Sequence, residues 1–240
     1  MDVLPTQQSY LRLKYPSTRM SSYTKGRVVT LTVTGAVVCP WSYIATLELR
    51  KAIARAYTNR LPLRFQIEYR PFECKSLLHD PTDWEKVEAQ GRATGIHSTL
   101  TCRAQKLGAT LRGQSNARLK SASASRLLLY AYQTGGQNAQ QALLTELFRA
   151  QHEKDEDIDD FEILADYCER AGIMSREEGF MFLESNCLLD EVEQTADIAR
   201  SMGISVIPLT VIDNKWSLVG AQSSEVYYQI FYKLSQGKDL

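Results

Sequence analysis

The sequence lacks most of the features that would place the protein in a membrane, on a nucleic acid or outside the cell. No apolar run approaches the ~18 residues that a membrane-spanning helix needs. The 28 Lys and Arg residues are balanced by 28 Asp and Glu, and no basic patch carries interleaved aromatic residues, so we expect neither nucleic acid nor membrane as a partner. The five cysteines are odd in number and widely spaced, which argues against a disulfide framework and favours a reducing compartment.

Signatures of bound metals and phosphates are also missing. The three histidines are scattered, and no Cys/His pair has the spacing of metal ligands, so we expect no metal site. No glycine-rich loop for a phosphate is present. The acidic run Asp155–Asp160 lacks the ligand spacing and the turn glycine of a calcium loop, which favours a solvated loop.

The sequence does contain Cys39-Pro40-Trp41-Ser42, shortly after the β-rich run Val28–Thr34. Proline is tolerated in the first position of a helix because its missing N–H would have no intrahelical partner there. The free amides and the positive end of the helix dipole then favour the thiolate of Cys39 over the thiol. A small buried cysteine without chemistry is the simpler alternative. Ser42, one turn further along, either hydrogen-bonds the thiolate or is a relic of lost chemistry, and the sequence leaves both open.

The hydrophobic pattern predicts strands at both ends of the chain. At the start, the strand Val28–Thr34, a helix beginning at Pro40 and the alternating strand Leu63–Arg70 form a βαβ unit, whose two strands are normally parallel. Residues 74–202 have a helical pattern, with a helix stop at Gly135-Gly136.

The end of the chain predicts a ββα unit. Val206–Ile212 has the pattern of a strand interrupted by Pro208, and a turn separates it from a second strand, Trp216–Val219. A closing helix over Ser223–Leu234 is expected to bury Val226, Ile230 and Leu234. Strands at both ends with a long helical stretch between them indicate one fold interrupted by an insertion.

The first 27 residues read as a separate segment without sustained periodicity. They hold five basic residues against the single acid Asp2, slightly like an organellar transit segment. We interpret them as a flexible tail ahead of the first strand and expect a cytoplasmic protein, with organellar targeting as the alternative.

Four segments resemble a known family in their order and spacing. They are Cys39-Pro40-Trp41, Arg70-Pro71-Phe72, the run Ala199–Pro208 and Gly220-Ala221-Gln222. Together they resemble the FrnE-like branch of the DsbA family. This resemblance implies an α/β thioredoxin fold with an all-helical insertion, and a cis peptide bond before Pro208 that faces the active cysteine. It divides the chain into a thioredoxin-like domain, residues 28–73 and 203–240, and a helical insertion, residues 74–202.

Three positions depart from that family. Ser42 stands in place of the second active-site cysteine, Val206 in place of a glycine, and Ser125 in place of the histidine in an Ala-His-Arg sequence. Without the second cysteine the motif cannot close the internal disulfide by which a dithiol oxidoreductase releases its partner. Cys74 is a more distant candidate for a resolving cysteine.

A related group of enzymes resembles the second half of the motif. Ser42-Tyr43-Ile44-Ala45 looks like the Ser-Tyr-Leu-Ala of 2-hydroxychromene-2-carboxylate isomerases, which share this fold and insertion with kappa-class glutathione transferases. Those enzymes usually carry a serine at the position of Cys39 and use its hydroxyl to hold the thiolate of bound glutathione.

The resemblance implies a thiol oxidoreductase that uses a single cysteine, with glutathione as co-substrate. Cys39 would be the nucleophile and Ser42 its hydrogen-bond donor. The residues expected to bind substrate or glutathione are Pro40, Trp41, Ile207, Pro208 and Gln222, although Gln222 has a capping role as an equal alternative. A glutathione-dependent isomerase or transferase acting on a small, secondary-metabolite-like substrate is the second interpretation, and a non-catalytic binding protein is the third. A homodimer is compatible with each of them.

Overall fold

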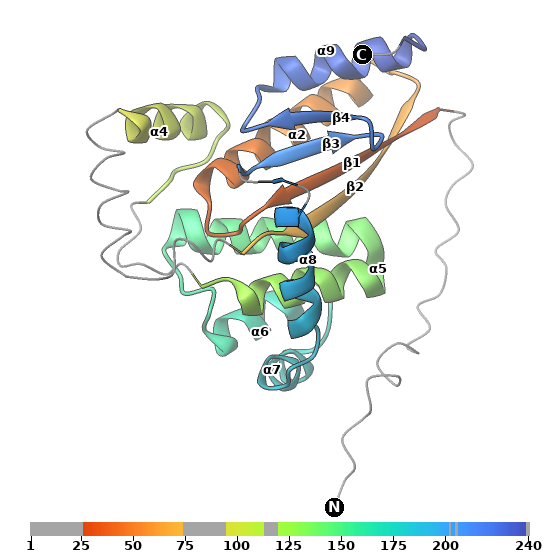
Figure 1. Cartoon of the computed structure of the whole chain (residues 1–240). Helices are drawn as coiled ribbons and strands as arrows, with labels where there is room; N and C mark the ends of the chain where they lie inside the picture. Colours follow the sequence, from red (N-terminus) through yellow and green to blue (C-terminus); the bar gives the residue numbers. More distant parts are fainter. Residues whose placement is uncertain (1–25, 74–94, 113–119, 202, 205, 239–240) are drawn as a thin grey trace, which may run out of the picture.

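The computed structural model describes residues 26–73, 95–112, 120–201, 203–204 and 206–238 (Figure 1). The thioredoxin-like part contains β1 (Arg27–Gly35), α2 (Pro40–Thr58), β2 (Leu63–Pro71), β3 (Leu209–Ile212), β4 (Trp216–Val219) and α9 (Ser224–Ser235). The helices between β2 and β3 are α4 (Ile96–Lys106), α5 (Ala122–Arg149), the π-helix η2 (Ala150–Lys154), α6 (Phe161–Arg170), α7 (Arg176–Glu184) and α8 (Leu189–Ser201).

The four strands form one mixed sheet in the order β2-β1-β3-β4. β1 pairs with β2 in parallel, as the sequence predicts for a βαβ unit, and β3 is antiparallel to both β1 and β4. The βαβ start and the ββα finish therefore share a sheet, although about 140 residues of chain separate β2 from β3.

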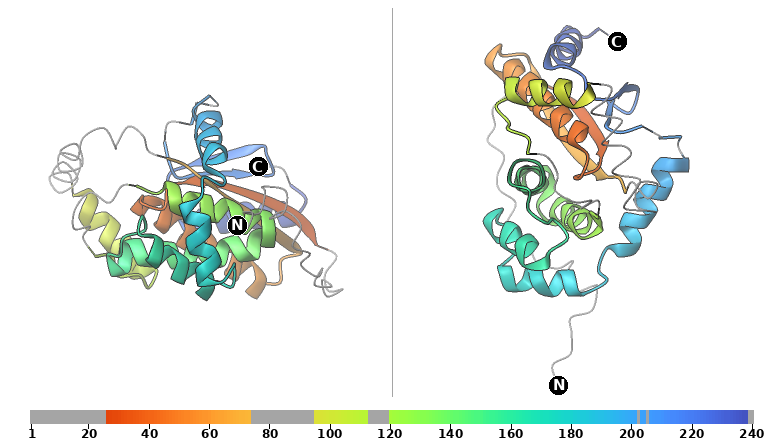
Figure 2. Two further views of the ribbon diagram at one scale, coloured as in Figure 1. Left: turned by 90° about the horizontal axis from the view of Figure 1, so that it is seen from below. Right: turned by 90° about the vertical axis from the view of Figure 1, so that its left-hand side faces the viewer.

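The two faces of the sheet differ in polarity and in what covers them. Along β1, Val29, Leu31 and Val33 are buried, whereas the alternate positions are threonines. The valine and leucine side packs against α2 and α9, which also contact each other. Figure 2 shows α2 on one side of the sheet and α8 on the other. The threonine side is consequently the one that α8 partly covers.

The closing helix buries a different face from the one that its sequence suggests. Tyr227, Phe231 and Leu234 are buried in α9, whereas Val226 is exposed and Ile230 is half-buried. The prediction is confirmed for Leu234 and was wrong for Val226 and Ile230, because it counted only aliphatic residues and left out the aromatic ones. The Tyr227 ring can be buried since its hydroxyl lies 2.9 Å from the hydroxyl of Thr210, which satisfies both groups.

Two predicted boundaries also change. β3 begins at Leu209 and not at Val206, because Pro208 has no N–H to donate to a neighbouring strand. The predicted helix stop at Gly135-Gly136 is a kink inside α5, where Gly136 has φ 63° and ψ −157°, a conformation that glycine adopts without steric cost.

Two glutamine side chains from α5 cover the outer edge of β2. The Gln140 side chain is fully buried, and its amide accepts from Tyr69 N–H at 2.7 Å and donates to the Tyr69 carbonyl at 2.9 Å. Gln137 accepts from Ile67 N–H at 2.7 Å. These bonds replace those of a neighbouring strand, so α5 closes one edge of the sheet.

Candidate functional site

Cys39 is the N-cap residue of α2, with Pro40 in the first turn as the sequence predicts. Its backbone is extended, and its carbonyl accepts from Ser42 N–H and Tyr43 N–H at 3.0 and 3.2 Å. The Cys39 side chain caps no helix amide and is half-buried. The thiol therefore lies at the positive end of a 19-residue helix with part of its surface open to solvent.

Ser42 lies on the inner side of the same helical turn. It is fully buried, and within the described residues its hydroxyl has no hydrogen-bond partner, Cys39 included. It faces the last residue of β1, Gly35, where a Cβ atom would lie 2.8 Å from Ser42 Oγ and 2.9 Å from the Tyr69 hydroxyl. Glycine is thus required at position 35 if both hydroxyls are to keep their positions.

The Ile207–Pro208 peptide bond is cis, which confirms the conformation that the family resemblance implies. Leu209, the next residue, pairs with Thr34 near the end of β1, five residues before Cys39. The Pro208 carbonyl accepts from Gly220 N–H at 2.8 Å, and Ile207 is half-buried. The cis bond therefore lies at the end of the sheet from which the chain turns toward Cys39.

Trp41 and the segment before α9 are brought together by Arg103 of α4, a residue that the sequence analysis did not single out. The Arg103 guanidinium donates to the carbonyls of Ala221 and Gln222 at 2.9 and 3.3 Å. It also pairs with the Glu48 carboxylate at 3.0 Å and lies 5.7 Å from the centre of the Trp41 ring. One side chain from the helical part thereby fixes two borders of the candidate site.

The Gln222 side chain is used inside its own loop. Its amide nitrogen donates to the carbonyl of Val219 at 2.7 Å, which closes the turn between β4 and α9. The second oxygen of Glu48 accepts from Ser224 N–H, at the start of α9, at 2.8 Å. The cap of α9 is Ser223, whose hydroxyl accepts from Val226 N–H, so the Gln222 side chain does not cap the helix, and its contact with a ligand stays a prediction.

His152 of η2 contacts the turn between β1 and α2. It is buried, and its Nε2 lies 2.8 Å from the carbonyl oxygen of Val37. Because a carbonyl can only accept, Nε2 carries the proton and donates. Burial lowers the pKa of His152 to about 4, so the ring is neutral near pH 7. The histidine seemed isolated in the sequence because its partner lies 115 residues away.

Tyr43, in the first turn of α2, also contacts η2. Its ring stacks on His152 with centroids 5.5 Å apart and on Phe148 at 5.0 Å. Its hydroxyl donates to Glu153 at 2.6 Å, and burial together with this carboxylate raises the pKa of Tyr43. The helical part is thus joined to α2 within one turn of Cys39.

Of the other described cysteines, Cys168 and Cys102 differ from Cys39 in exposure, whereas Cys187 is half-buried like Cys39. Cys168 is buried, and burial raises the pKa of its thiol to about 12, as for an unreactive cysteine of the core. Burial also raises the pKa of Cys187, whereas Cys102 is exposed on α4. Among the described residues, Cys39, Cys102, Cys168 and Cys187 form no disulfide. Cys74 lies outside the described residues.

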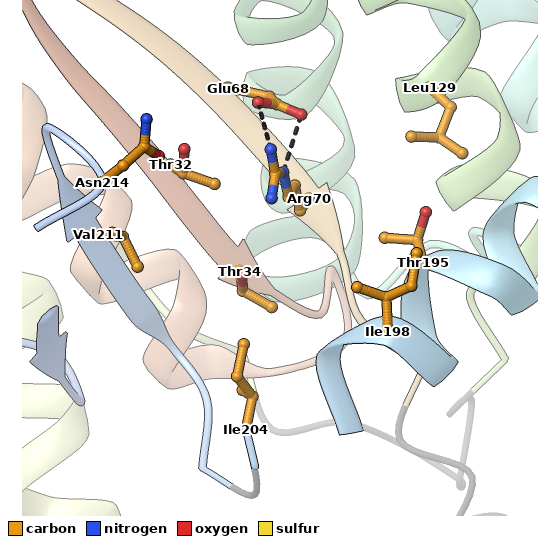
Figure 3. A pocket seen from close by; sticks show the side chains of 10 residues that line it. All are labelled: Thr32, Thr34, Glu68, Arg70, Leu129, Thr195, Ile198, Ile204, Val211 and Asn214. Atoms are coloured by element: carbon orange, nitrogen blue, oxygen red, sulfur yellow. Dashed lines mark hydrogen bonds and ion pairs between the residues drawn. The ribbon is translucent and has the colours of Figure 1, made fainter. Parts of the chain in front are cut away.

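A cavity of about 480 Å³ opens between the threonine face of the sheet and α8 (Figure 3). Its polar wall contains the ion pair of Glu68 with Arg70, at 2.9 Å, and the side chain of Thr34. The remaining lining residues are Thr32, Leu129, Thr195, Ile198, Ile204, Val211 and Asn214. This volume is in the range of small-molecule sites. The cavity lies between the two parts of the chain, and none of the predicted site residues lines it.

Within the described ranges, no helix combines the length and apolarity needed to cross a lipid bilayer. The same residues contain no group of three or more His, Cys, Asp or Glu side chains arranged to hold a metal ion.

Comparison with known proteins identifies a family and several similar structures. A model of the DSBA-like thioredoxin domain matches residues 35–231. The probable DsbA oxidoreductase of Streptomyces coelicolor has 22% identity and a TM-score of 0.68, over 88% of this chain and 92% of that one. A search of curated proteins gives no significant match.

Two further structures show the same fold at lower identity. A 2-hydroxychromene-2-carboxylate isomerase has 17% identity and a TM-score of 0.62, over 86% of this chain and 95% of that one. The cytosolic disulfide reductase DsbM of Pseudomonas aeruginosa, solved with GSH, has 16% identity and a TM-score of 0.52, over 87% of this chain and 98% of that one.

Proposed function

Because the chain belongs to the DSBA-like thioredoxin domain family, we propose that it is a thiol oxidoreductase that acts through a single cysteine, Cys39. It has the α/β thioredoxin fold with a helical insertion. The observation that carries the proposal is the position of Cys39, half-buried at the start of α2, at the sheet end that also carries Ile207–Pro208. Within the family, we place the chain in the FrnE-like branch.

The proposed chemistry is thiol–disulfide exchange with glutathione. The Cys39 thiolate attacks the glutathione sulfur of a disulfide between glutathione and the substrate, the S–S bond breaks, and the substrate leaves as a thiolate. Glutathione is then bound to Cys39 by a disulfide, and the thiolate of a second glutathione attacks the sulfur of the bound glutathione. Oxidised glutathione is released and the Cys39 thiolate is restored, so one disulfide is consumed and one is formed.

The residues around Cys39 are assigned roles that fit this exchange. Ser42, whose hydroxyl has no other partner among the described residues, donates a hydrogen bond to the thiolate after a rotation about its Cα–Cβ bond. Pro40 and Trp41 border the thiol, and the backbone of Ile207 and Pro208 pairs with the partner. The GSH-bound structure of DsbM supports glutathione as the co-substrate. The cytoplasm, which is rich in reduced glutathione, is the proposed compartment.

The test is covalent labelling followed by mass spectrometry. Oxidised glutathione is expected to add one glutathione at Cys39, and the adduct should be stable because Ser42 cannot displace it. The matched controls are Cys39→Ser, which should lose the adduct, and Cys102→Ser, which should keep it because Cys102 is merely exposed on α4. A Cys39 that resists oxidised glutathione in the folded protein would refute the oxidoreductase proposal. An internal disulfide from Cys39 to Cys74 would refute the single-cysteine mechanism.

The second candidate is a glutathione-dependent isomerase or transferase. The cavity between the sheet and α8 favours it, because such an enzyme needs room for a small substrate between the thioredoxin-like part and the helical part. The likeness to the 2-hydroxychromene-2-carboxylate isomerase is a likeness of fold. Reversible binding of reduced glutathione, with no adduct at Cys39 after exposure to oxidised glutathione, would favour this candidate over the first.

A further inference from the structure

The turn that leads from β1 to Cys39 is buried and short. Ala36, Val37 and Val38 are each at most 3% exposed, and Cys39 N–H donates to the Ala36 carbonyl at 3.0 Å. The carbonyl of Val37 points into the protein, where a polar group needs a partner. Its partner comes from the helical part of the chain, as the Nε2 of His152 at 2.8 Å.

His152 contacts the chain on both sides of Cys39. It donates to Val37, two residues before the cysteine, and stacks on Tyr43, four residues after it, with the two rings inclined by only 11°. His152 is itself held in place by two contacts. The Phe148 ring packs against the imidazole with the ring centroids 5.9 Å apart, and the backbone carbonyl of His152 accepts from Arg112 N–H at 2.8 Å. One buried side chain therefore contacts both the turn before Cys39 and the first turn of α2, the two segments that determine the position of the thiol.

We propose that His152 is a positioning residue for Cys39: its hydrogen bond to Val37 fixes the turn so that the thiol stays aligned with the amides at the start of α2. This inference rests on the proposed function of Cys39. His152 does not touch the reacting sulfur in this role and transfers no proton. It acts by fixing the direction of the Val37 carbonyl and with it the path of the turn. A small displacement of a reacting group, here the Cys39 thiol, is enough to lower a reaction rate.

Two substitutions separate the hydrogen bond from the ring. His152→Phe keeps an aromatic ring to stack on Tyr43 but leaves the Val37 carbonyl without its donor. His152→Gln loses the ring, yet its amide nitrogen is as many bonds from the backbone as the histidine Nε2 and can donate to the same carbonyl. If the hydrogen bond positions the turn, His152→Phe should therefore change the reactivity of Cys39 and His152→Gln should preserve it.

The measurement is the rate of alkylation of Cys39 by iodoacetamide near pH 7, divided by the rate of Cys102 in the same molecules. Cys102 is exposed on α4 and serves as the internal reference. We expect this ratio to fall about fivefold or more in His152→Phe and to stay within about twofold of the unaltered protein in His152→Gln. Urea unfolding of both variants shows whether each is folded and how much stability it has lost.

An unchanged ratio in a folded His152→Phe protein overturns the proposal, as does an equal fall in both variants. Neither result affects the glutathione adduct of the unaltered protein, which tests the proposed function separately. If His152→Phe does not fold, the test moves to the unaltered protein. The ¹⁵N resonance of His152 Nε2 should then shift when Cys39 is modified with methyl methanethiosulfonate, and an unshifted resonance overturns the proposal.

Discussion

Lowering the pH from 7 to 5 is expected to destabilise the protein through His152, because the buried ring must gain a proton that its surroundings disfavour. Burial lowers the pKa of His152 from 6.5 to about 4. Between these values the unfolded chain binds the proton and the folded protein does not, so the free energy of unfolding falls as the pH falls. The loss from this residue is about 2 kcal/mol between pH 7 and pH 5, and about 3 kcal/mol by pH 4.

The assay is urea unfolding, followed by circular dichroism, at several pH values between 7 and 4. His152→Gln is the matched variant, because it keeps a donor for the Val37 carbonyl and has no proton to gain. Other groups titrate alike in both proteins, so the difference between their free energies of unfolding isolates His152. From pH 7 to pH 5, the unaltered protein should lose about 2 kcal/mol more of its free energy of unfolding than His152→Gln loses. A difference that does not change with pH would show that His152 is accessible to protons in the folded protein.

Two further predictions concern the candidate site. Ser42→Cys should give a disulfide with Cys39, because the two positions lie one helical turn apart; intact mass after oxidised glutathione should then show the loss of two hydrogens in place of a stable adduct, and a persistent adduct would contradict this. Arg103→Ala should lower the free energy of unfolding by about 2–4 kcal/mol, because the nearly buried Glu48 carboxylate keeps its hydrogen bond from Ser224 N–H but loses its positively charged partner. Arg170→Ala, which removes the more exposed ion pair with Glu146, should cost about 0–1 kcal/mol in the same urea titration, and equal losses would refute the contrast.

The parts of the fold that the sequence predicts are those with local signals. The parallel pair β1 and β2 follows from apolar runs on either side of one helix. The helix α7 begins at a capping box of Ser175 and Glu178, which is visible three residues apart in the sequence and present in the structure. The face of α9 was mispredicted because the buried tyrosine depends on a hydroxyl in another element, Thr210.

The same distinction applies to the candidate site. Cys39 and Pro40 are found by their place after a strand, and the cis bond at Pro208 by family resemblance. His152 and Arg103 carry no local pattern, because the hydrogen-bond partners of their side chains lie 55 or more positions away in the chain. A histidine among acidic residues and an arginine on a polar helix look like surface residues until the fold supplies their partners.

Because glutamines of α5 cover the outer edge of β2, this edge is open to pairing with other chains for part of the time that the protein is being synthesised. Gln140 follows Tyr69, whose backbone it pairs with, by 71 residues. At ~5–20 residues per second, a ribosome needs roughly 4–14 seconds to make the intervening chain. Throughout this interval the outer edge of β2 has no partner of its own and can pair with a strand of another nascent chain. The helical insertion that contacts the region around Cys39 thus also supplies the cover for β2, and β2 is synthesised before that cover exists.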